Sequence, residues 1–305
     1  MLSQFTRRGL LFATAAAAAG FRSSAAQSDV PLFSYPVGFP GQVFGDGFHI
    51  RHAYAVENTA FLLDWWHTGE NWYALGGESA GLGVYAAAAG EVAYVGSDYP
   101  GPVVIVRHAD DLYSMYGHLA YGVRTAVGDR VARGQQIGAI LDRTDGRSPS
   151  HLHFEFRTFL TTPDVNGDAP SYGYACGYQC PPGPGYWPMS DPRHPSEMGW
   201  RNPTHVINRR MYPDGVPPGA EIVITAGAGG DAPLWSLPPD MDGAERVGAL
   251  PLQPGGRYPL LEIDSGPEAS RGTSAKAYRV WYRITTPTGD AAWLQAVVPS
   301  TAATG

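Results

Sequence analysis

Charged side chains, cysteines and long apolar runs are all scarce in this chain of 305 residues. Only 16% of the residues are charged and the net charge is −7. Nucleic acid is not expected as a partner, because phosphate binding needs basic patches and none appears. Apart from the N-terminus, no apolar run is long enough to span a bilayer. Helical signals are few as well, since the run 86–89 is short and Gly90 ends it.

Cysteine occurs only twice, as Cys176 and Cys180. In an oxidising compartment this pair would form a disulfide that closes a very short loop, worth about 2–3 kcal/mol. A zinc site built on the pair would need two further ligands, and the nearest candidate, His194, is far along the chain. We therefore expect a local disulfide.

The N-terminal residues 1–26 have the layout of an export signal. The pair Arg7-Arg8 precedes an apolar run, 13–20, and small residues follow at 24–26. The paired arginines resemble the twin-arginine signal, and the alternative is an ordinary N-terminal helix. This layout predicts export, a mature chain that begins near Gln27, and a location in the periplasm, in the cell wall or outside the cell.

Glycine and proline are abundant, with 39 and 27 residues, which suits short strands joined by many turns. We predict an all-β protein with an N-terminal domain over 27–212 and a smaller domain over 213–305. The segment 31–60 is expected to be an extended lead-in, and 158–201 a long insertion that forms a wall of a substrate groove. Strands are predicted at 84–86, 91–95, 103–107, 112–118, 127–131, 136–141, 150–157, 222–225, 258–263, 277–285 and 292–297.

The predicted strand 150–157 carries the most unusual pattern of the chain. Side chains alternate between the faces of a strand, so Leu152, Phe154 and Phe156 share one face while His151 and His153 share the other. Two imidazoles side by side can converge on one ion or substrate. The alternative is that both are surface histidines or hydrogen-bonded core histidines. Two upstream histidines, His67 and His118, favour a functional site. Two histidines and one carboxylate, with a fourth position for water, are a common ligand set for catalytic zinc.

Five spaced segments together resemble the M23 (lysostaphin/LytM-type) metallopeptidases: 67–72, 84–92, 113–119, 127–138 and 150–157. The resemblance covers roughly 39–207. It implies a small antiparallel β-domain of the duplicated hybrid-motif type, with a groove, and Zn²⁺-dependent cleavage of peptides in peptidoglycan. By position it also implies metal ligands at His67, Asn71 and His153, with His118 and His151 polarising the water and stabilising the tetrahedral intermediate.

The chain departs from the family pattern at Asn71, where the family has aspartate. An amide oxygen brings no negative charge to the ion, so zinc affinity should fall by at least the roughly 10–100-fold that supporting contacts are worth. Glu70 and Asp64 are the nearest alternative acids. A zinc peptidase is the prediction. The rival is a degenerate domain that binds cell wall or activates a partner hydrolase.

The last third of the chain resembles a bacterial SH3-like domain, in which an aromatic strand and a turn precede a strand that opens with Trp. The matching residues are 279–284, Gly289-Asp290 and Trp293-Leu294. This resemblance implies a module that binds cell-wall peptide or polysaccharide. The alternative is that Trp281 and Trp293 are core residues.

A calcium-binding loop and a lipoyl- or biotinyl-type carrier domain are not expected. The run 164–168 mimics the start of a calcium loop, but Ala169 stands where glycine is needed and no distal glutamate follows. The segment 127–138 also resembles the turn of a lipoyl or biotinyl carrier. A carrier needs a lysine at the hairpin tip, and the only lysine, Lys276, lies in the C-terminal part.

Overall fold

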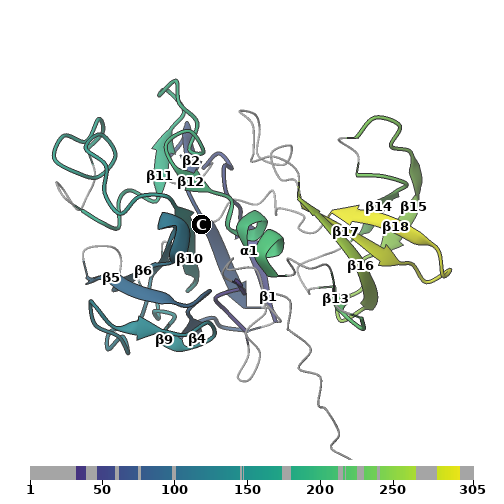
Figure 1. Cartoon of the computed structure of the whole chain (residues 1–305), viewed down its shortest axis with the longest axis horizontal. Coiled ribbons are helices and arrows are strands. Elements are labelled where there is room, and N and C mark those ends of the chain that lie inside the picture. The colour runs from purple at the N-terminus through teal and green to yellow at the C-terminus, as the bar shows by residue number, and fades with distance from the viewer. Residues whose placement is uncertain are drawn as a thin grey trace, which may run out of the picture.

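The computed structural model describes 32–38, 47–58, 62–74, 77–97, 101–144, 146, 148–173, 180–211, 216, 218–224, 230–238, 241–265 and 280–295. The expected signal segment 1–26 and Cys176 lie outside these residues. The described part is almost entirely β-structure (Figure 1). This confirms the predicted all-β class, with an N-terminal β-domain followed by a second antiparallel sheet.

The N-terminal part contains twelve strands, one 3₁₀ turn and one helix among the described residues. They are β1 (Phe48–His52), β2 (Trp65–His67), β3 (Glu70–Ala74), β4 (Gly83–Tyr85), β5 (Gly90–Gly96), β6 (Val103–Arg107), η1 (Ala109–Asp111), β7 (Tyr113–Gly117), β8 (Arg130–Val131), β9 (Gln136–Ala139), β10 (Leu152–Arg157), β11 (Tyr186–Pro188), β12 (Trp200–Arg201) and α1 (Pro203–Met211).

The main sheet has eight antiparallel strands in the order β1-β3-β10-β7-β6-β5-β8, with β12 also paired to β10. Strands predicted at 84–86, 91–95, 103–107, 112–118, 136–141 and 150–157 correspond to β4, β5, β6, β7, β9 and β10. The extended lead-in is only partly correct, because 48–52 form the edge strand β1. Its burial alternates residue by residue, as expected when one face of a strand packs on a core.

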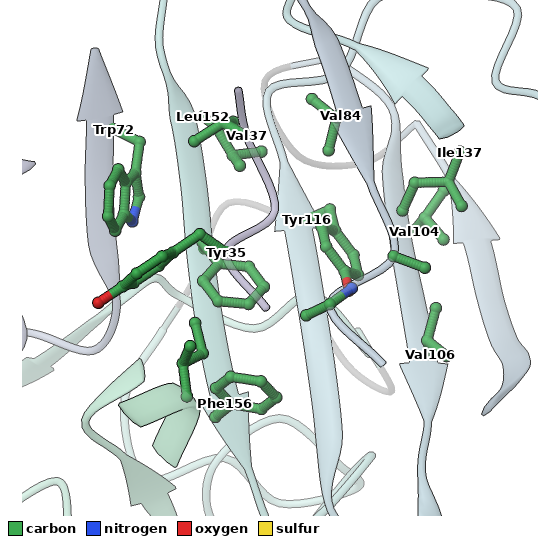
Figure 2. Close-up of a cluster of buried hydrophobic side chains, with 14 of the residues drawn as sticks. Tyr35, Val37, Trp72, Val84, Val104, Val106, Tyr116, Ile137, Leu152 and Phe156 are labelled. Carbon is green, nitrogen blue, oxygen red and sulfur yellow. The ribbon is translucent and has the colours of Figure 1, made fainter. Parts of the chain in front are cut away.

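The main hydrophobic core lies on one face of this sheet (Figure 2). The apolar side chains of β10, with Tyr116 and Val104 from neighbouring strands, pack towards Val37, Val84 and Ile137. Leu152, Phe154 and Phe156 are all fully buried there, as the alternation predicted. His153, Glu155 and Arg157 therefore point to the opposite face, where they are also fully buried.

The described residues after β10, 158–173 and 180–201, form a unit with its own small core. Trp187 of β11 and Trp200 of β12 pack with Phe159 and Val165, and Tyr54 joins them from the lead-in. Strand β11 pairs with β2, so this segment is fixed directly beside His67. Cys180 in the same segment is disulfide-bonded.

Helix α1 begins at a recognisable cap. The side-chain oxygen of Asn202 accepts a hydrogen bond from the backbone N–H of His205 at 3.0 Å, and Pro203 occupies the first helical position. The helix contacts β10 of the main sheet and also the second sheet (Figure 1). No helix within the described ranges is both long and apolar enough to cross a membrane.

The second sheet has six antiparallel strands in the order β13-β16-β17-β18-β14-β15. They are β13 (Glu221–Val223), β14 (Asp231–Trp235), β15 (Arg246–Pro251), β16 (Arg257–Ser265), β17 (Val280–Thr285) and β18 (Ala291–Gln295). Four of these were predicted, whereas β14 and β15 were not. Trp293 is buried at 6% exposure, but Trp281 is only partly buried.

Candidate metal centre

Strand register places two of the predicted site residues opposite each other. His153 of β10 pairs with Asn71 of β3, and on its other side with Gly117 of β7. His118 follows β7 directly, so the same row of the sheet carries residues that are far apart in sequence. His67 ends β2, one short turn before β3.

The turn between β2 and β3 depends on a glycine. A Cβ atom on Gly69 would lie 2.4 Å from the backbone carbonyl oxygen of Phe154 and 2.8 Å from Cγ of Glu155. Only a residue without a side chain allows the turn to pass this close to β10. Gly69 thereby lets His67 approach His153.

Three atoms from the predicted ligands converge at one point. Nε2 of His67 lies 3.1 Å from Nδ1 of His153, and the same Nδ1 lies 3.0 Å from Oδ1 of Asn71. The exposed fraction of each of these three side chains is 2% or less. They form a compact, water-excluded set of donor atoms.

The outer ring nitrogens of His67 and His153, which face away from this point, are already hydrogen-bonded. Nδ1 of His67 lies 3.1 Å from the carbonyl oxygen of Ala53, and Nε2 of His153 lies 2.9 Å from Oε1 of Glu155. Carbonyl and carboxylate oxygens only accept hydrogen bonds here, so each outer nitrogen carries the proton. The inner nitrogens then present lone pairs. Burial, with the neighbouring imidazoles His52 and His153, also lowers the pKa of His67 well below its ordinary value.

This geometry fits a zinc ion. Tetrahedral zinc with bonds of roughly 2.0–2.1 Å holds its ligand atoms about 3.3 Å apart, close to the two separations found here. Two lone-pair nitrogens and an amide oxygen that face one another also repel unless a cation or a proton lies between them. The charge fits less well, since among the described residues no group of three His, Cys, Asp or Glu side chains surrounds a common point.

Neither alternative acid replaces the missing carboxylate. Glu70 points to the core face, where its oxygens accept hydrogen bonds from Nε1 of Trp72 at 3.2 Å and the backbone N–H of Thr204 at 3.1 Å. Burial raises the pKa of Glu70 to about 7, although these hydrogen bonds oppose the rise. Asp64 is exposed. Asn71 remains the third donor.

His118 and His151 form a second pair beside these atoms. Their ring centres are 4.6 Å apart, and the ring of His118 lies 6.1 Å from that of His153. Nδ1 of His151 donates to the carbonyl oxygen of Pro149 at 2.8 Å, which leaves the lone pair on Nε2. Burial lowers the pKa of His151 to about 3. The ring also stacks on Tyr73 at 4.9 Å.

The backbone at His118 adopts a left-handed conformation, with φ of 60°. This is uncommon for a residue other than glycine and persists only where surrounding structure holds it. Here the carbonyl oxygen of His118 accepts a hydrogen bond from the N–H of Leu141 at 2.8 Å, and Leu119 bonds to Pro102 at 3.0 Å. The turn is thus fixed on both sides of the imidazole.

A further imidazole, His52, was not predicted from the sequence. It lies opposite Asn71 on the edge strand β1, and its ring stacks on His67 with centres 4.0 Å apart and planes within 5°. Both ring nitrogens of His52 are buried without a hydrogen-bond partner. Burial, aided by His153, lowers its pKa to about 4. Alternation over 48–52 would instead group His52 with Phe48 and Ile50, which face the core. The register shift between Ile50 and His52 brings the imidazole opposite Asn71, and no local sequence signal marks that shift.

Glu155 is the second residue to which no role was given. Burial raises its pKa, but the hydrogen bond from His153, together with the charge of Arg157 and the hydrogen bond from Thr68, holds the pKa below its ordinary value. The carboxylate is therefore ionised at neutral pH. Its position two residues after His153 places it on the same face of β10.

The sequence model of peptidase family M23 matches residues 67–168, which include all five predicted site residues. The cell division protein DipM of Caulobacter vibrioides is 36% identical over 86 residues, which are 28% of this chain and 14% of that protein. The matched segment is thus a small part of that curated relative.

Among solved structures, a zinc-containing peptidase from Vibrio cholerae is 25% identical, with 41% of this chain and 36% of that chain covered and a TM-score of 0.32. Lysostaphin is 16% identical, with 82% of this chain and 88% of that chain covered and a TM-score of 0.37. The match over 67–168 supports an M23 peptidase domain in this part of the chain, and the converging His67, Asn71 and His153 lie within the matched residues.

Proposed function

We propose that this protein is a zinc-dependent endopeptidase that hydrolyses peptide bonds in peptidoglycan. The observation that supports this proposal most directly is the convergence of His67 Nε2, Asn71 Oδ1 and His153 Nδ1, with the outer nitrogens of both rings occupied. Zinc bound there would polarise a peptide carbonyl and lower the pKa of a bound water to roughly 7.

The remaining chemistry falls to His151 and His118. The lone pair on Nε2 of His151 can accept a hydrogen bond and so orient the attacking water. The low pKa of His151 keeps its imidazole neutral at neutral pH, so the ring can accept a hydrogen bond from the water. His118, with its ring 4.6 Å away, would donate to the oxygen that becomes negative in the tetrahedral intermediate.

Export through the twin-arginine route would bring the protein to its substrate. The disulfide-bonded Cys180 is consistent with an oxidising compartment. We also propose that the C-terminal sheet is an SH3-like module that binds cell-wall peptide or polysaccharide and holds the peptidase near its substrate.

The second candidate function is a cell-wall-binding or partner-activating domain without hydrolysis. One observation favours it: the third donor, Asn71, is a neutral amide. An amide can rotate to offer its NH₂ group to His153, so a metal-free centre can satisfy the lone pair that an ionised aspartate would oppose.

A turbidity assay on isolated sacculi separates the two candidates. The purified mature chain should lower the turbidity and release new amino groups, and a chelator should abolish both effects until zinc is restored. The His118→Ala variant serves as the matched inactive protein. A purified chain that binds sacculi but releases no amino groups, either with chelator or with added zinc, would support the binding domain instead.

A further inference from the structure

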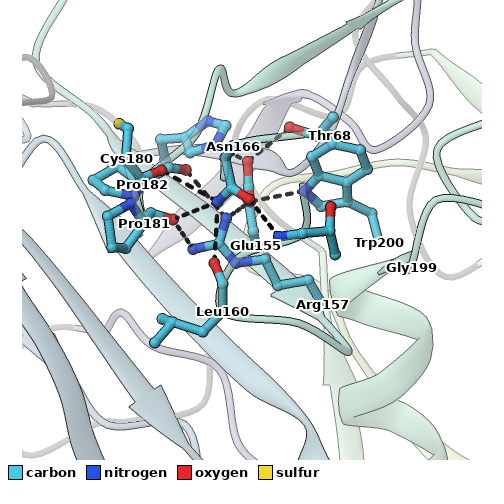
Figure 3. A network of polar contacts seen from close by, with 12 residues as sticks. Thr68, Glu155, Arg157, Leu160, Asn166, Cys180, Pro181, Pro182, Gly199 and Trp200 are labelled. Carbon is cyan, nitrogen blue, oxygen red and sulfur yellow. Dashed lines mark hydrogen bonds and ion pairs between the residues drawn. The ribbon is translucent and has the colours of Figure 1, made fainter. Parts of the chain in front are cut away.

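Glu155 lies at the centre of a buried hydrogen-bond network behind the candidate metal centre (Figure 3). Its Oε1 accepts hydrogen bonds from Nε2 of His153 at 2.9 Å and from the hydroxyl of Thr68 at 2.7 Å. Its Oε2 accepts one from Nε1 of Trp200 at 3.0 Å. Each carboxylate oxygen is thus fixed by at least one donor from a different part of the chain.

Arg157 connects this carboxylate to the segment 158–201. Its NH1 lies 3.7 Å from Oε2 of Glu155 and donates to the carbonyl oxygen of Pro182 at 3.2 Å, while NH2 donates to that of Pro181. Figure 3 shows Asn166 closing the same loop, because its Nδ2 donates to the carbonyl oxygens of Cys180 and Pro181 at 3.2 and 3.3 Å. A fully buried guanidinium is stable only when it is paired in this way.

This network fixes the orientation of the His153 imidazole. A carboxylate acceptor holds the proton on Nε2 and sets the ring orientation, so that Nδ1 faces His67 and Asn71. Thr68 supports Glu155 from the β2–β3 turn, whereas Trp200 and the loop that binds Arg157 come from the segment 158–201. This segment therefore reaches the metal centre by two routes. Trp200 and the loop that binds Arg157 act on His153 through Glu155, whereas β11 pairs with β2 beside His67.

We propose that 158–201 is a positioning element for metal binding, and that Trp200 and Glu155 are positioning residues that act through His153. This inference rests on the proposed zinc site. It assigns 158–201 a role that differs from the groove wall expected from the sequence. It also predicts that a substitution remote from the ligands weakens zinc binding.

The chain offers a matched control for Trp200. Trp187 belongs to the same small core, is equally buried, and has its ring centre 5.7 Å from that of Trp200. Its Nε1 donates to the carbonyl oxygen of Arg193 at 3.2 Å instead of to Glu155. The substitutions Trp200→Phe and Trp187→Phe each remove one indole N–H from the same core, but only the first touches the network behind His153.

The test measures zinc affinity by competition with a chromophoric chelator, together with the visible spectrum of the Co²⁺-loaded protein. Trp200→Phe should weaken zinc binding by roughly 10-fold, and Glu155→Gln by roughly 10–100-fold. Both should alter the Co²⁺ spectrum, whereas Trp187→Phe should change neither. The double variant Trp200→Phe/Glu155→Gln should bind zinc little worse than Glu155→Gln alone, because both changes act on one contact.

Thermal unfolding of the metal-free proteins controls for general loss of structure. If Trp200→Phe and Trp187→Phe lower zinc affinity equally, the positioning role of the segment is wrong while the zinc site stands. If the wild type itself binds no zinc, the proposed function fails. The two failures are therefore distinguishable.

Discussion

Replacing Asn71 with aspartate should make the metal-free protein less stable than the metal-free wild type, and the zinc-loaded protein more stable than the zinc-loaded wild type. The new carboxylate would be buried at about the 2% exposure of the asparagine and 3.0 Å from the lone pair on Nδ1 of His153. An unpaired buried acceptor costs about 1–3 kcal/mol, so metal-free Asn71→Asp should be less stable than the wild type by about that amount.

With zinc bound, Asn71→Asp should be more stable to unfolding than the wild type. Restoring a negative ligand should raise zinc affinity by at least roughly 10–100-fold. At a fixed excess of free zinc, a 100-fold gain adds about 2.7 kcal/mol to the free energy of unfolding, or about 5–10 °C in melting temperature for a domain of this size. Sacculus hydrolysis at limiting zinc should rise in parallel.

The assay is thermal unfolding of both proteins in chelator and in a zinc buffer, with the dissociation constant measured by chelator competition. Asn202→Asp is the control, because Asn202 is equally buried but caps α1 by accepting a hydrogen bond from the backbone N–H of His205. Its zinc affinity should equal that of the wild type. If Asn71→Asp has unchanged or weaker zinc affinity, or changes stability equally with and without zinc, residue 71 is not a zinc ligand.

Three further substitutions have defined outcomes. His118→Ala should lower the turnover rate by about 10²–10⁴-fold while zinc affinity stays constant, as measured by amino-group release and chelator competition. Gly69→Ala should destabilise the fold by about 1–3 kcal/mol in denaturant unfolding, because its Cβ would strike the carbonyl oxygen of Phe154; wild-type stability would contradict the close approach. His52 has its pKa lowered from 6.5 to about 4, so the unfolded chain binds its proton first as the pH falls. The stabilisation present above pH 6.5, about 3 kcal/mol, should be lost progressively towards pH 4. His52→Phe should flatten that part of the stability–pH profile, and an unchanged profile would place the acid sensitivity elsewhere.

The sequence predicted β10 and its two faces because alternation of apolar side chains is a local property. It could not predict that the polar face of this strand is also fully buried. That burial depends on Trp200 and Pro181, which reach Glu155 and Arg157 from a segment whose Gly- and Pro-rich sequence has no periodicity. Irregular segments fold through such side-chain contacts, which leave no pattern in the sequence.

The site residues were found through motif resemblance, whereas their convergence depends on register. His153 meets Asn71 because β3 and β10 pair without an offset at this position, a property of the whole sheet. His52 was missed for the same reason, since its pairing with Asn71 depends on an edge strand within an apparently irregular lead-in. Strand β15 was missed because all but one of its residues are exposed, so its sequence lacks a period of two. Strand β14 does alternate, but Pro233 within it is a signal against a strand.

The most direct test of the metal centre is anomalous X-ray diffraction at the zinc edge from crystals of the mature protein grown with zinc. A zinc ion at this centre should give one strong peak about 2.0–2.2 Å from Nε2 of His67, Nδ1 of His153 and Oδ1 of Asn71. A map without a peak at these three atoms, at a zinc concentration that saturates the Asn71→Asp variant, would contradict the proposed zinc site.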